Sequence, residues 1–286
     1  MRIERDSGSA FRTLLVLVGL AVSVLLAAIF LSLLLFSRPA LLKNGFRFIT
    51  GTQWNPVAEN FQALAFVVGT LLTSFIALAI ATALSLALAI LLGHYSRTGA
   101  LAAVMKTAVE LLAGIPSVVY GLFGLGIFVL FFKFGTSILA ASLTLGIMTL
   151  PVIISTAEEA LRSVPRSFRT VSISLGATQW QTIRRIVLPQ SQPGILTGVI
   201  LGLERAAGET APILFTGVAF YLPTLPSSPL DPTMALPYHL YVISTQVPGM
   251  PQEIQYGTAL VLLVLVLGLN FLATIIRSRA RRRRQW

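Results

Sequence analysis

Three ionisable residues lie close together inside a segment that is otherwise apolar. In the stretch GVILGLERAAGETAPILFTG, residues 198–217, Glu204, Arg205 and Glu209 are surrounded by Leu, Ile, Ala, Gly and Thr. A guanidinium offers a planar fork of N–H donors that fits a tetrahedral oxyanion, whereas carboxylates within a membrane can relay protons. Anion binding and proton relay are therefore the two kinds of chemistry that this segment could support.

A structural salt bridge is the simplest alternative. Arg205 and Glu209 are four residues apart, so a helix places them on one face, where they can pair. However, a charge near the bilayer centre costs about 2.5 to 3.5 kcal/mol on insertion scales, so such residues usually face a protein interior or a wet path. We interpret Arg205 as facing a translocation path in which Glu209 holds the guanidinium between transport events. Glu204 and Thr210 are assigned to the same path.

The surrounding sequence is that of a membrane protein. The 286 residues are 55% hydrophobic and 11% charged, and the mean hydropathy is +0.84. A helix that crosses the hydrocarbon core needs about 20 largely apolar residues. Six segments qualify, and we therefore expect an all-α polytopic membrane protein with six transmembrane helices. They run over about 13–36, 61–92, 109–132, 136–157, 194–220 and 256–276.

The distribution of positive charge predicts the orientation. With the N-terminus inside, 16 of the 21 Lys and Arg residues flank the cytoplasmic side. Both termini are therefore predicted to be cytoplasmic. The first apolar segment is longer than the core of a signal peptide and has no A-x-A-like cleavage site, so it is interpreted as a retained helix. The tail RSRARRRRQW is interpreted as a topology anchor that meets anionic lipid head groups, not as a nucleic-acid contact.

Motifs for catalysis are missing from the sequence. There is no GxxxxGK[ST] loop for ATP, no GxSxG nucleophile motif and no Cys. The two histidines, His94 and His239, are far apart in sequence, and Glu158 and Glu159 point about 100° apart on a helix with no further acid nearby. We predict a non-catalytic chain that binds no metal and no cofactor of its own.

Three prolines are predicted to bend helices at membrane depth. Pro212 has no N–H and leaves the carbonyl of Gly208 without its donor, so the fifth helix should kink just beyond the charges. Pro116 in GIPS and Pro151 in MTLPV are expected to do the same to the third and fourth helices. Irregular backbone is tolerated in the membrane where it lines a cavity or is covered by protein. Cavity lining and packing both remain open for each proline.

The longest inner loop, residues 158–192, is predicted to contain two short helices separated at Gly176. In the second helix Trp180, Ile183 and Val187 fall at i, i+3 and i+7, which makes an apolar stripe. Such an amphipathic helix either lies on the lipid surface or fits a groove on a partner protein. The residues alone leave both uses open.

The spacing in this loop resembles the signature of ABC importer permeases, EAA-x(3)-G-x(9)-I-x-L-P. Gly176 is followed by nine residues and then by IVLP, whose Pro189 is expected to stop the second helix. In place of the E-A-A part the chain has Thr-Val-Ser at 170–172, which puts a charged contact there in doubt. The resemblance implies a cytoplasmic coupling helix that docks on an ATPase subunit. The residues assigned to it are Gly176, Trp180, Ile183, Ile186, Leu188 and Pro189.

Four longer stretches are similar to phosphate importer permeases of the PstA type, over roughly residues 60–277. RAAGETAPILFTG is the stretch that indicates phosphate. The stretches are GIPSVVYGLFGLGIFV at 114–129, EEALRSVPRSFR at 158–169, SLGATQWQTIRRIVLPQSQPGILTG at 174–198 and RAAGETAPILFTG at 205–217.

This resemblance implies a domain layout and a set of partners. A type 1 ABC importer permease core would occupy 61–277, with the coupling loop at 158–192 and an outer loop at 221–255. Residues 1–60 would hold the cytoplasmic N-terminus, the first helix and an outer loop, and 278–286 would be a basic cytoplasmic tail. The implied partners are a homologous second permease, two ATPase subunits that bind ATP and Mg, and an extracytoplasmic phosphate-binding protein, in a bacterial cytoplasmic (inner) membrane.

Two other functions stay open. An arginine in a cavity does not distinguish tetrahedral anions, so an ABC permease for molybdate, tungstate or a phosphonate fits the same residues. An ion-driven carrier would use Glu204 and Glu209 as a proton relay and would need no ATPase. An intramembrane enzyme is disfavoured by the missing motifs.

Overall fold

Long apolar helices make up most of the described chain. The structure is a computed structural model that describes residues 3–55, 60–95, 99–219, 222 and 225–282. Within these residues, five helices are long and apolar enough to cross a membrane, and a bent helix pair makes a sixth span if it is counted as one. The expected all-α membrane fold is confirmed. Residues 283–286 of the predicted tail lie outside the described residues.

A small hairpin lies near the start of the described chain. Three short π-helical turns (η) extend α3 and α5 and link α8 to α9. Strand β1 pairs antiparallel with β2, so that Trp54 faces Phe61. The bounds are α1 (Ile3–Asn44), α2 (Arg47–Thr50), β1 (Trp54–Asn55), β2 (Asn60–Phe61), α3 (Leu64–Ile90), η1 (Leu91–Tyr95), α4 (Ala100–Gly114), α5 (Ser117–Gly124), η2 (Leu125–Phe131), α6 (Ile138–Ser163), α7 (Arg166–Ser174), α8 (Gln179–Thr182), η3 (Ile183–Val187), α9 (Leu188–Gly208), α10 (Ala211–Thr216), α11 (Leu236–Thr245) and α12 (Gln252–Arg282).

Helix α6 is the centre of the bundle and packs against both α3 and α9. Small residues allow this close packing, because a Cβ added at Gly202 of α9 would lie 2.8 Å from the side chain of Ile153. A buried hydrogen bond adds to the contact with α3, since the Ser142 hydroxyl donates to the carbonyl of Thr73 at 3.2 Å. α6 therefore fixes the positions of the two helices beside it.

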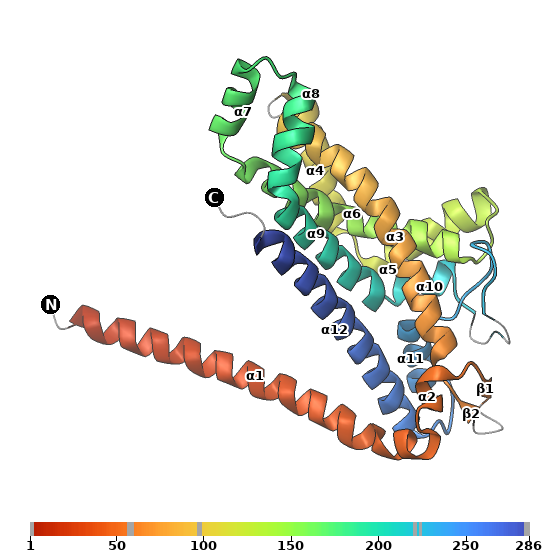
Figure 1. Cartoon of the computed structure of the whole chain (residues 1–286). Coiled ribbons are helices and arrows are strands. Elements are labelled where there is room, and N and C mark those ends of the chain that lie inside the picture. Colours follow the sequence, from red (N-terminus) through yellow and green to blue (C-terminus); the bar gives the residue numbers. More distant parts are fainter. Residues whose placement is uncertain (1–2, 56–59, 96–98, 220–221, 223–224, 283–286) are drawn as a thin grey trace.

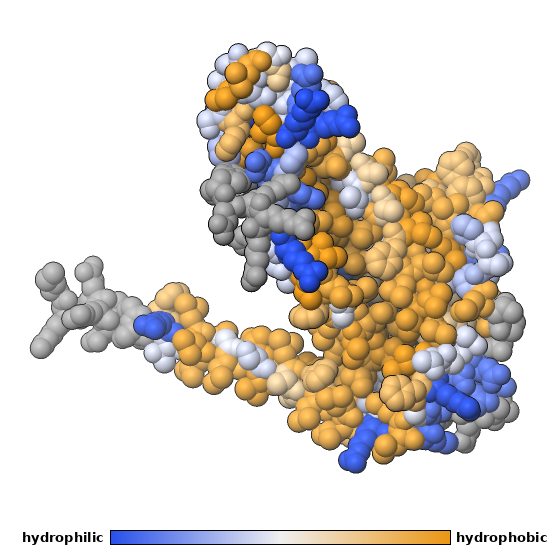
Figure 2. All heavy atoms as spheres, viewed as in Figure 1, coloured by the Kyte–Doolittle hydropathy of each residue, from blue (hydrophilic) through white to orange (hydrophobic). Residues whose placement is uncertain are grey.

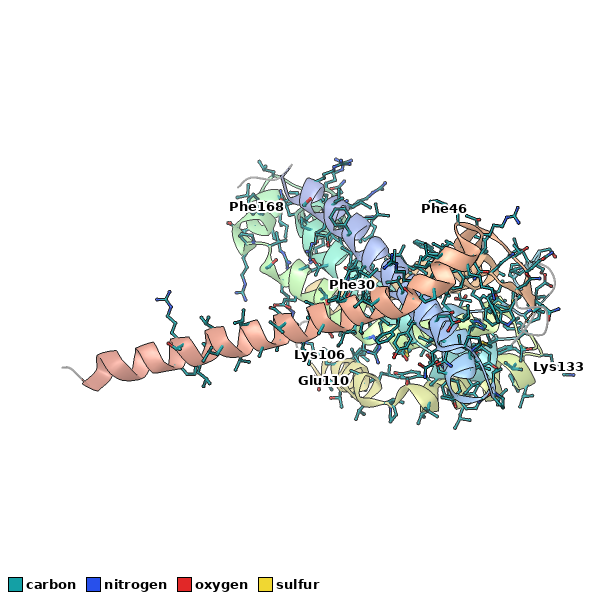
Figure 3. The ribbon with its side chains drawn as sticks, turned by 90° about the horizontal axis from the view of Figure 1, so that it is seen from below. Phe30, Phe46, Lys106, Glu110, Lys133 and Phe168 are labelled. Atoms are coloured by element: carbon teal, nitrogen blue, oxygen red, sulfur yellow. The ribbon has the colours of Figure 1, made fainter. Side chains whose placement is uncertain are left out.

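Helix α1 leaves the bundle. Its C-terminal part lies beside α12, where the rings of Phe36 and Tyr256 are 5.0 Å apart, but its N-terminal part projects away from the other helices (Figures 1 and 3). Its most apolar stretch is not buried inside the chain. The body of the molecule has an apolar face with hydrophilic residues gathered at its two ends (Figure 2). This distribution is that of a protein surrounded by a lipid bilayer.

The third predicted span, 109–132, is wrong in form. Two helices replace it, α4 and the α5–η2 segment, and they are bent by 102° relative to each other. Ile115 is extended (φ −73°, ψ 130°), and Pro116 is the N-cap residue that precedes α5. The residue before a proline is disfavoured in the helical region, which explains why the chain breaks here and does not merely kink.

The fifth predicted span, 194–220, is also corrected. Its helix starts at Gln179 and continues through α8, η3 and α9 to Gly208. Pro189 therefore does not stop the helix. The N–H of Leu188 bonds to the carbonyl of Ile183, five residues back, and this wider π-helical turn precedes the proline.

An aromatic cluster joins the hairpin to α3 and α11 at the end of the bundle opposite α7. The His239 ring stacks on Phe66 at 3.8 Å between ring centres and meets Trp54 edge-on at 4.1 Å, and Trp54 also packs against Phe61. His239 is buried. Burial lowers the pKa of His239 to about 3, so the ring is neutral at physiological pH.

We predict that acid opens this cluster. The unfolded pKa of histidine is about 6.5, so the stability that depends on neutral His239 is fully present above that pH and is lost as the pH falls toward 3. At pH 4.5 the loss should be about 2 to 3 kcal/mol. Trp54 fluorescence, in a background with Trp180 and Trp286 changed to Phe, should shift to the red on acidification. His239→Phe should abolish that shift, and a Trp54 signal that does not change between pH 7 and 4 in the parent would contradict the prediction.

Candidate functional site

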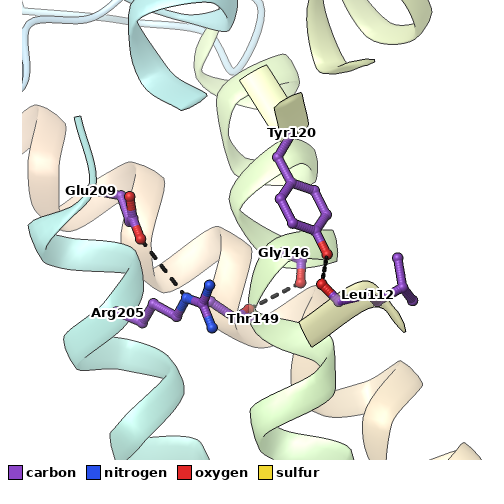
Figure 4. Close-up of polar contacts among 6 residues, drawn as sticks. All are labelled: Leu112, Tyr120, Gly146, Thr149, Arg205 and Glu209. Carbon is purple, nitrogen blue, oxygen red and sulfur yellow. Dashed lines mark hydrogen bonds and ion pairs between the residues drawn. The ribbon is translucent and has the colours of Figure 1, made fainter. Parts of the chain in front are cut away.

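Arg205 and Glu209 lie where the fifth span is interrupted. α9 ends at Gly208, Glu209 is extended (φ −81°, ψ 135°), and α10 begins at Ala211. The Nε atom of Arg205 lies 3.8 Å from Oε1 of Glu209, and the two side chains are 31% and 23% exposed (Figure 4). This distance exceeds the 2.7–2.9 Å of a tight charge-assisted hydrogen bond, so the pair is loose.

The guanidinium of Arg205 keeps donors available. Within the described part of the chain, no carboxylate other than Glu209 lies within ion-pair distance of it. The two terminal nitrogens therefore keep N–H groups that can meet an anion. An oxyanion arriving at this point would find a planar fork that is held only at its Nε side.

A second broken span meets the first one here. α5, which follows the break at Pro116, packs against α10, which follows the break at Glu209. The contact depends on Gly121, because an added Cβ would lie 2.9 Å from the carbonyl of Ala211 and 2.7 Å from the ring of Phe215. Two interrupted helices at one place are typical of membrane-protein sites where irregular backbone lines a cavity or is covered by protein.

Tyr120 belongs to this site and was not predicted from the sequence. It is buried, and its hydroxyl donates to the carbonyl of Leu112 at 2.7 Å, across the break between α4 and α5 (Figure 4). The Tyr120 hydroxyl is also close enough to Arg205 to interact electrostatically with its charge. The motif GIPSVVYG contains Tyr120, but its role requires the bend that brings α4 back to it, and periodicity does not show that bend.

The other residues assigned to the path are not all brought together. Glu204 lies on a different face of α9, in the seam that also contains Asn270 of α12, because neighbouring helix positions point about 100° apart. Thr210 precedes α10 and its side chain makes no capping hydrogen bond. The structure therefore groups Arg205, Glu209 and Thr210 around the break and separates Glu204 from them.

The three prolines behave differently from one another. Pro116 stands at a true break and is exposed. Pro212 is buried in the first turn of α10, where an N–H is not needed, and the break precedes it by two residues. Pro151 is buried inside α6, which continues through it without interruption. The bend expected at Pro151 stays a prediction, but the helix is not interrupted there.

The loop between α6 and α9 presents an apolar surface that differs from the predicted one. Ile183 and Val187 are buried in the bundle, whereas Trp180 is 52% exposed, so the predicted stripe is split. Leu175, at 82%, is more exposed still and lies beside Gly176, whose φ of +85° allows the turn between α7 and α8. Ile186, Leu188 and Pro189 are partly exposed.

Helix α7 supplies most of the rest of this surface. Phe168, Val171 and Leu175 are exposed at i, i+3 and i+7, and Ile173 is exposed beside them. This helical spacing is visible in the sequence and could have identified α7 as part of the surface.

Two buried polar contacts hold α7 in place. The hydroxyls of Ser172 and Thr182 lie 2.8 Å apart, which joins α7 to α8. Arg169 is buried and donates to the carbonyl of Leu161 at 2.6 Å, near the end of α6. Ser172 stands at the second alanine of the E-A-A part, whereas its acidic position is occupied by Thr170, whose exposed hydroxyl donates to the carbonyl of Arg166 at 3.2 Å.

The paired carboxylates at the end of α6 also have a structural role. Oε1 of Glu158 lies 2.7 Å from Arg162 and 3.2 Å from Lys106 of α4. The ion pair with Lys106 ties α4 to α6, whereas the ion pair with Arg162 lies within α6. In the part of the chain that the structure describes, no group of three or more metal-ligating side chains is present.

Comparisons with known proteins give consistent results. Residues 85–285 match a family described as binding-protein-dependent transport system inner membrane component. The chain is 36% identical over 234 residues to the phosphate transport system permease protein PstC of Pasteurella multocida, which covers 73% of each protein. It is also 36% identical over 218 residues to the phosphate transport system permease protein PstA 1 of Mycobacterium tuberculosis, which covers 76% of this chain and 70% of that one.

A solved structure shares the fold. A chain of the inward-facing MetNI methionine ABC transporter superimposes with a TM-score of 0.63 at 18% sequence identity. The match covers 80% of this chain and 99% of the other. The described bundle is therefore the fold of an ABC importer permease.

The hydrogen bond between Ser172 and Thr182 leads to a prediction about stability. Ser172→Ala should lower the free energy of unfolding by about 1 to 3 kcal/mol, because it leaves the buried Thr182 hydroxyl without its partner. Denaturant titration of the purified chain measures this loss. The double variant with Thr182→Val should lose less than the sum of the two single changes. As a control, Thr170→Ala changes an exposed hydroxyl on the same helix, and its free energy of unfolding should stay within about 0.5 kcal/mol of the parent. If the losses from Ser172→Ala and Thr182→Val add in full, the predicted coupling between the two hydroxyls is contradicted.

Proposed function

The chain belongs to the family of binding-protein-dependent transport system inner membrane components, and we propose that it forms the path for inorganic phosphate in an ATP-driven importer. It is a non-catalytic, multi-pass permease subunit of the inner membrane. Relatives named PstC and PstA match at the same 36% identity, so the proposal assigns the chain to phosphate permeases as a group. The observation that carries the proposed path is the loosely held Arg205 at the break of the fifth span.

Arg205 is proposed to exchange partners during transport. In the absence of an anion Glu209 neutralises the guanidinium, and the 3.8 Å separation indicates that this pairing is easily replaced. A phosphate would take the terminal N–H groups of the arginine, and Glu209 would take the guanidinium back when the phosphate leaves. Because the partner is replaceable, the site passes the anion on and does not trap it.

Further groups at the break complete the proposed path. Thr210 follows Glu209 directly in the chain, and Tyr120 comes from α5, which packs against α10. Pro116 and Pro212 keep their proposed role as the prolines next to interrupted backbone. Glu204 lies against α12, away from the break, and is not part of the proposed anion contact.

Membership of the family implies ATPase and binding-protein partners. We propose that an ATPase subunit, which supplies the ATP and Mg site, docks on the exposed apolar surface of α7 and α8. Leu175, Val171 and Trp180 are large apolar side chains that are exposed in that part of the loop. Buried Ile183 positions the helix from inside. The full assembly would contain two ATPase subunits, a homologous second permease and an extracytoplasmic phosphate-binding protein.

The proposed orientation follows from the docking surface. The end of α12 lies at the same end of the bundle as α7 and α8 (Figure 1). If the ATPase docks there, the C-terminus is cytoplasmic, as the distribution of positive charge also indicates. A cytoplasmic N-terminus follows if α1 crosses the membrane once.

The ion-driven alternative is weakened by the geometry. A proton relay between Glu204 and Glu209 needs the two carboxylates on one path, but Glu204 faces α12 while Glu209 pairs with Arg205 at the break. Transport of another tetrahedral oxyanion is the alternative that fits the same residues.

Replacing Arg205 tests the path. In vesicles with the reconstituted complex, Arg205→Gln should lower phosphate uptake by about 10- to 100-fold, because the charged hydrogen bonds to the anion are lost. ATP turnover should persist and the complex should assemble. Arg205→Lys should recover only part of the uptake, since it keeps the charge but lacks the fork. Uptake near the parent level in Arg205→Gln would show that the arginine is only a structural partner of Glu209.

Competition between anions tests the substrate. Uptake of labelled phosphate by the same vesicles should fall with unlabelled phosphate and change little with molybdate, tungstate or a phosphonate at equal concentration. Collapse of the proton gradient with an uncoupler should leave ATP-dependent uptake in place. Stronger competition by another oxyanion would reassign the substrate, and uptake without the ATPase subunit would contradict the importer.

A further inference from the structure

A cavity with a mixed lining, apolar over most of its surface and with a guanidinium and hydroxyls among its side chains, lies between α9 and α12, near the end of the bundle that carries α7 and α8. Its volume is about 430 Å³. α9 contributes one side of it and the last turns of α12 contribute the other. The lining residues are Pro193, Gly194, Thr197, Thr274, Arg277 and Ser278.

Hydrogen-bond donors dominate the polar part of this lining. Arg277 is partly exposed, and the described chain gives it no ion-pair partner. Thr274 lies one turn away on the same face of α12, so its hydroxyl and the guanidinium point into the cavity from one side. No carboxylate is among the lining residues. The cavity therefore favours an anion over a cation.

The hydroxyls of Thr197 and Ser278 already make local hydrogen bonds but can turn toward a ligand. Thr197 donates to the carbonyl of Pro193 at 3.0 Å, and Ser278 donates to the carbonyl of Ile275 at 2.9 Å. Each hydroxyl can rotate toward an anion at the loss of one local hydrogen bond. A guanidinium and up to three hydroxyls suit the tetrahedral oxygens of a phosphate group.

We propose that this cavity binds a phosphate group, supplied either by the head group of an anionic phospholipid or by free inorganic phosphate. It is separate from the site at Arg205, because Thr197 and Arg205 are eight residues apart on α9, or about 12 Å along the axis. The proposal does not depend on which substrate the chain transports.

The dimensions of the cavity suit a head group. Its volume corresponds to on the order of ten water molecules, which leaves room for glycerol beside a phosphate. Basic pockets between transmembrane helices at the cytoplasmic side are a known mode of anionic-lipid binding.

Binding to the purified, full-length chain in its complex tests the site. The probes are short-chain phosphatidylglycerol, short-chain phosphatidylcholine and inorganic phosphate, each titrated by calorimetry. The variants are Arg277→Gln and Thr274→Val, which keeps the shape of the side chain but removes its hydroxyl. Arg279→Gln is the matched control, because Arg279 is exposed two residues further on and does not line the cavity.

Saturable binding of phosphatidylglycerol that weakens at least tenfold in Arg277→Gln and about threefold in Thr274→Val supports the site. Arg279→Gln should bind within twofold of the parent, and phosphatidylcholine should not saturate. Equal weakening in Arg277→Gln and Arg279→Gln would overturn the proposal, because the basic helix end would then act without a defined cavity. The absence of saturable binding by both phosphatidylglycerol and inorganic phosphate would also overturn it.

Inorganic phosphate is titrated in the Arg205→Gln background, so that the proposed transport site does not contribute. Binding that persists there and is lost on adding Arg277→Gln identifies free phosphate as an occupant and supports the site. Phosphate binding that disappears in Arg205→Gln alone is assigned to the transport path. The phosphatidylglycerol titration then decides whether the cavity binds a phosphate group. This arrangement separates a failure of the cavity from a failure of the transport function.

Discussion

Backbone hydrogen bonding is the constraint on which the rest of this structure depends. Lipid offers no partner for a free N–H or carbonyl, so an interrupted helix in a membrane has to be covered by protein or to line a wet cavity. The chain meets this requirement by placing two interruptions together. α5 and α10 begin just after them and pack closely through Gly121, and the Tyr120 hydroxyl satisfies the Leu112 carbonyl at the first break.

The same constraint explains why the charged pair is where it is. Arg205 and Glu209 would be costly in the middle of a regular lipid-facing helix. At the break they lie beside polar backbone and near Tyr120. The charges and the irregular backbone, which both need polar surroundings within the membrane, are therefore grouped in one place. α6, which packs against α3 and α9, supplies the rigid support for this arrangement.

The sequence predicts the membrane fold and the charged segment well because both depend on local composition. Apolar segments of sufficient length give the spans, and the i, i+4 spacing gives the Arg205–Glu209 pair. The errors come from contacts that are distant in sequence. Pro151 has the same local signal as Pro116, yet α6 stays intact around it because it is enclosed by other helices, whereas the GIPS segment turns by 102°. The split between buried Ile183 and exposed Trp180 likewise depends on how the helix docks on the bundle, which an apolar stripe does not specify.

The uninterrupted run from Gln179 to Gly208 makes the loop surface and the charged site two ends of one rod. Trp180 and Arg205 are 25 residues apart, or roughly 38 Å of helix at 1.5 Å per residue. A rigid lever of that length converts a tilt of about 5° at one end into a displacement of roughly 3 Å at the other. That displacement equals a hydrogen-bond length, so a small rocking movement imposed on the exposed tryptophan would be enough to carry the guanidinium from one set of neighbours to another.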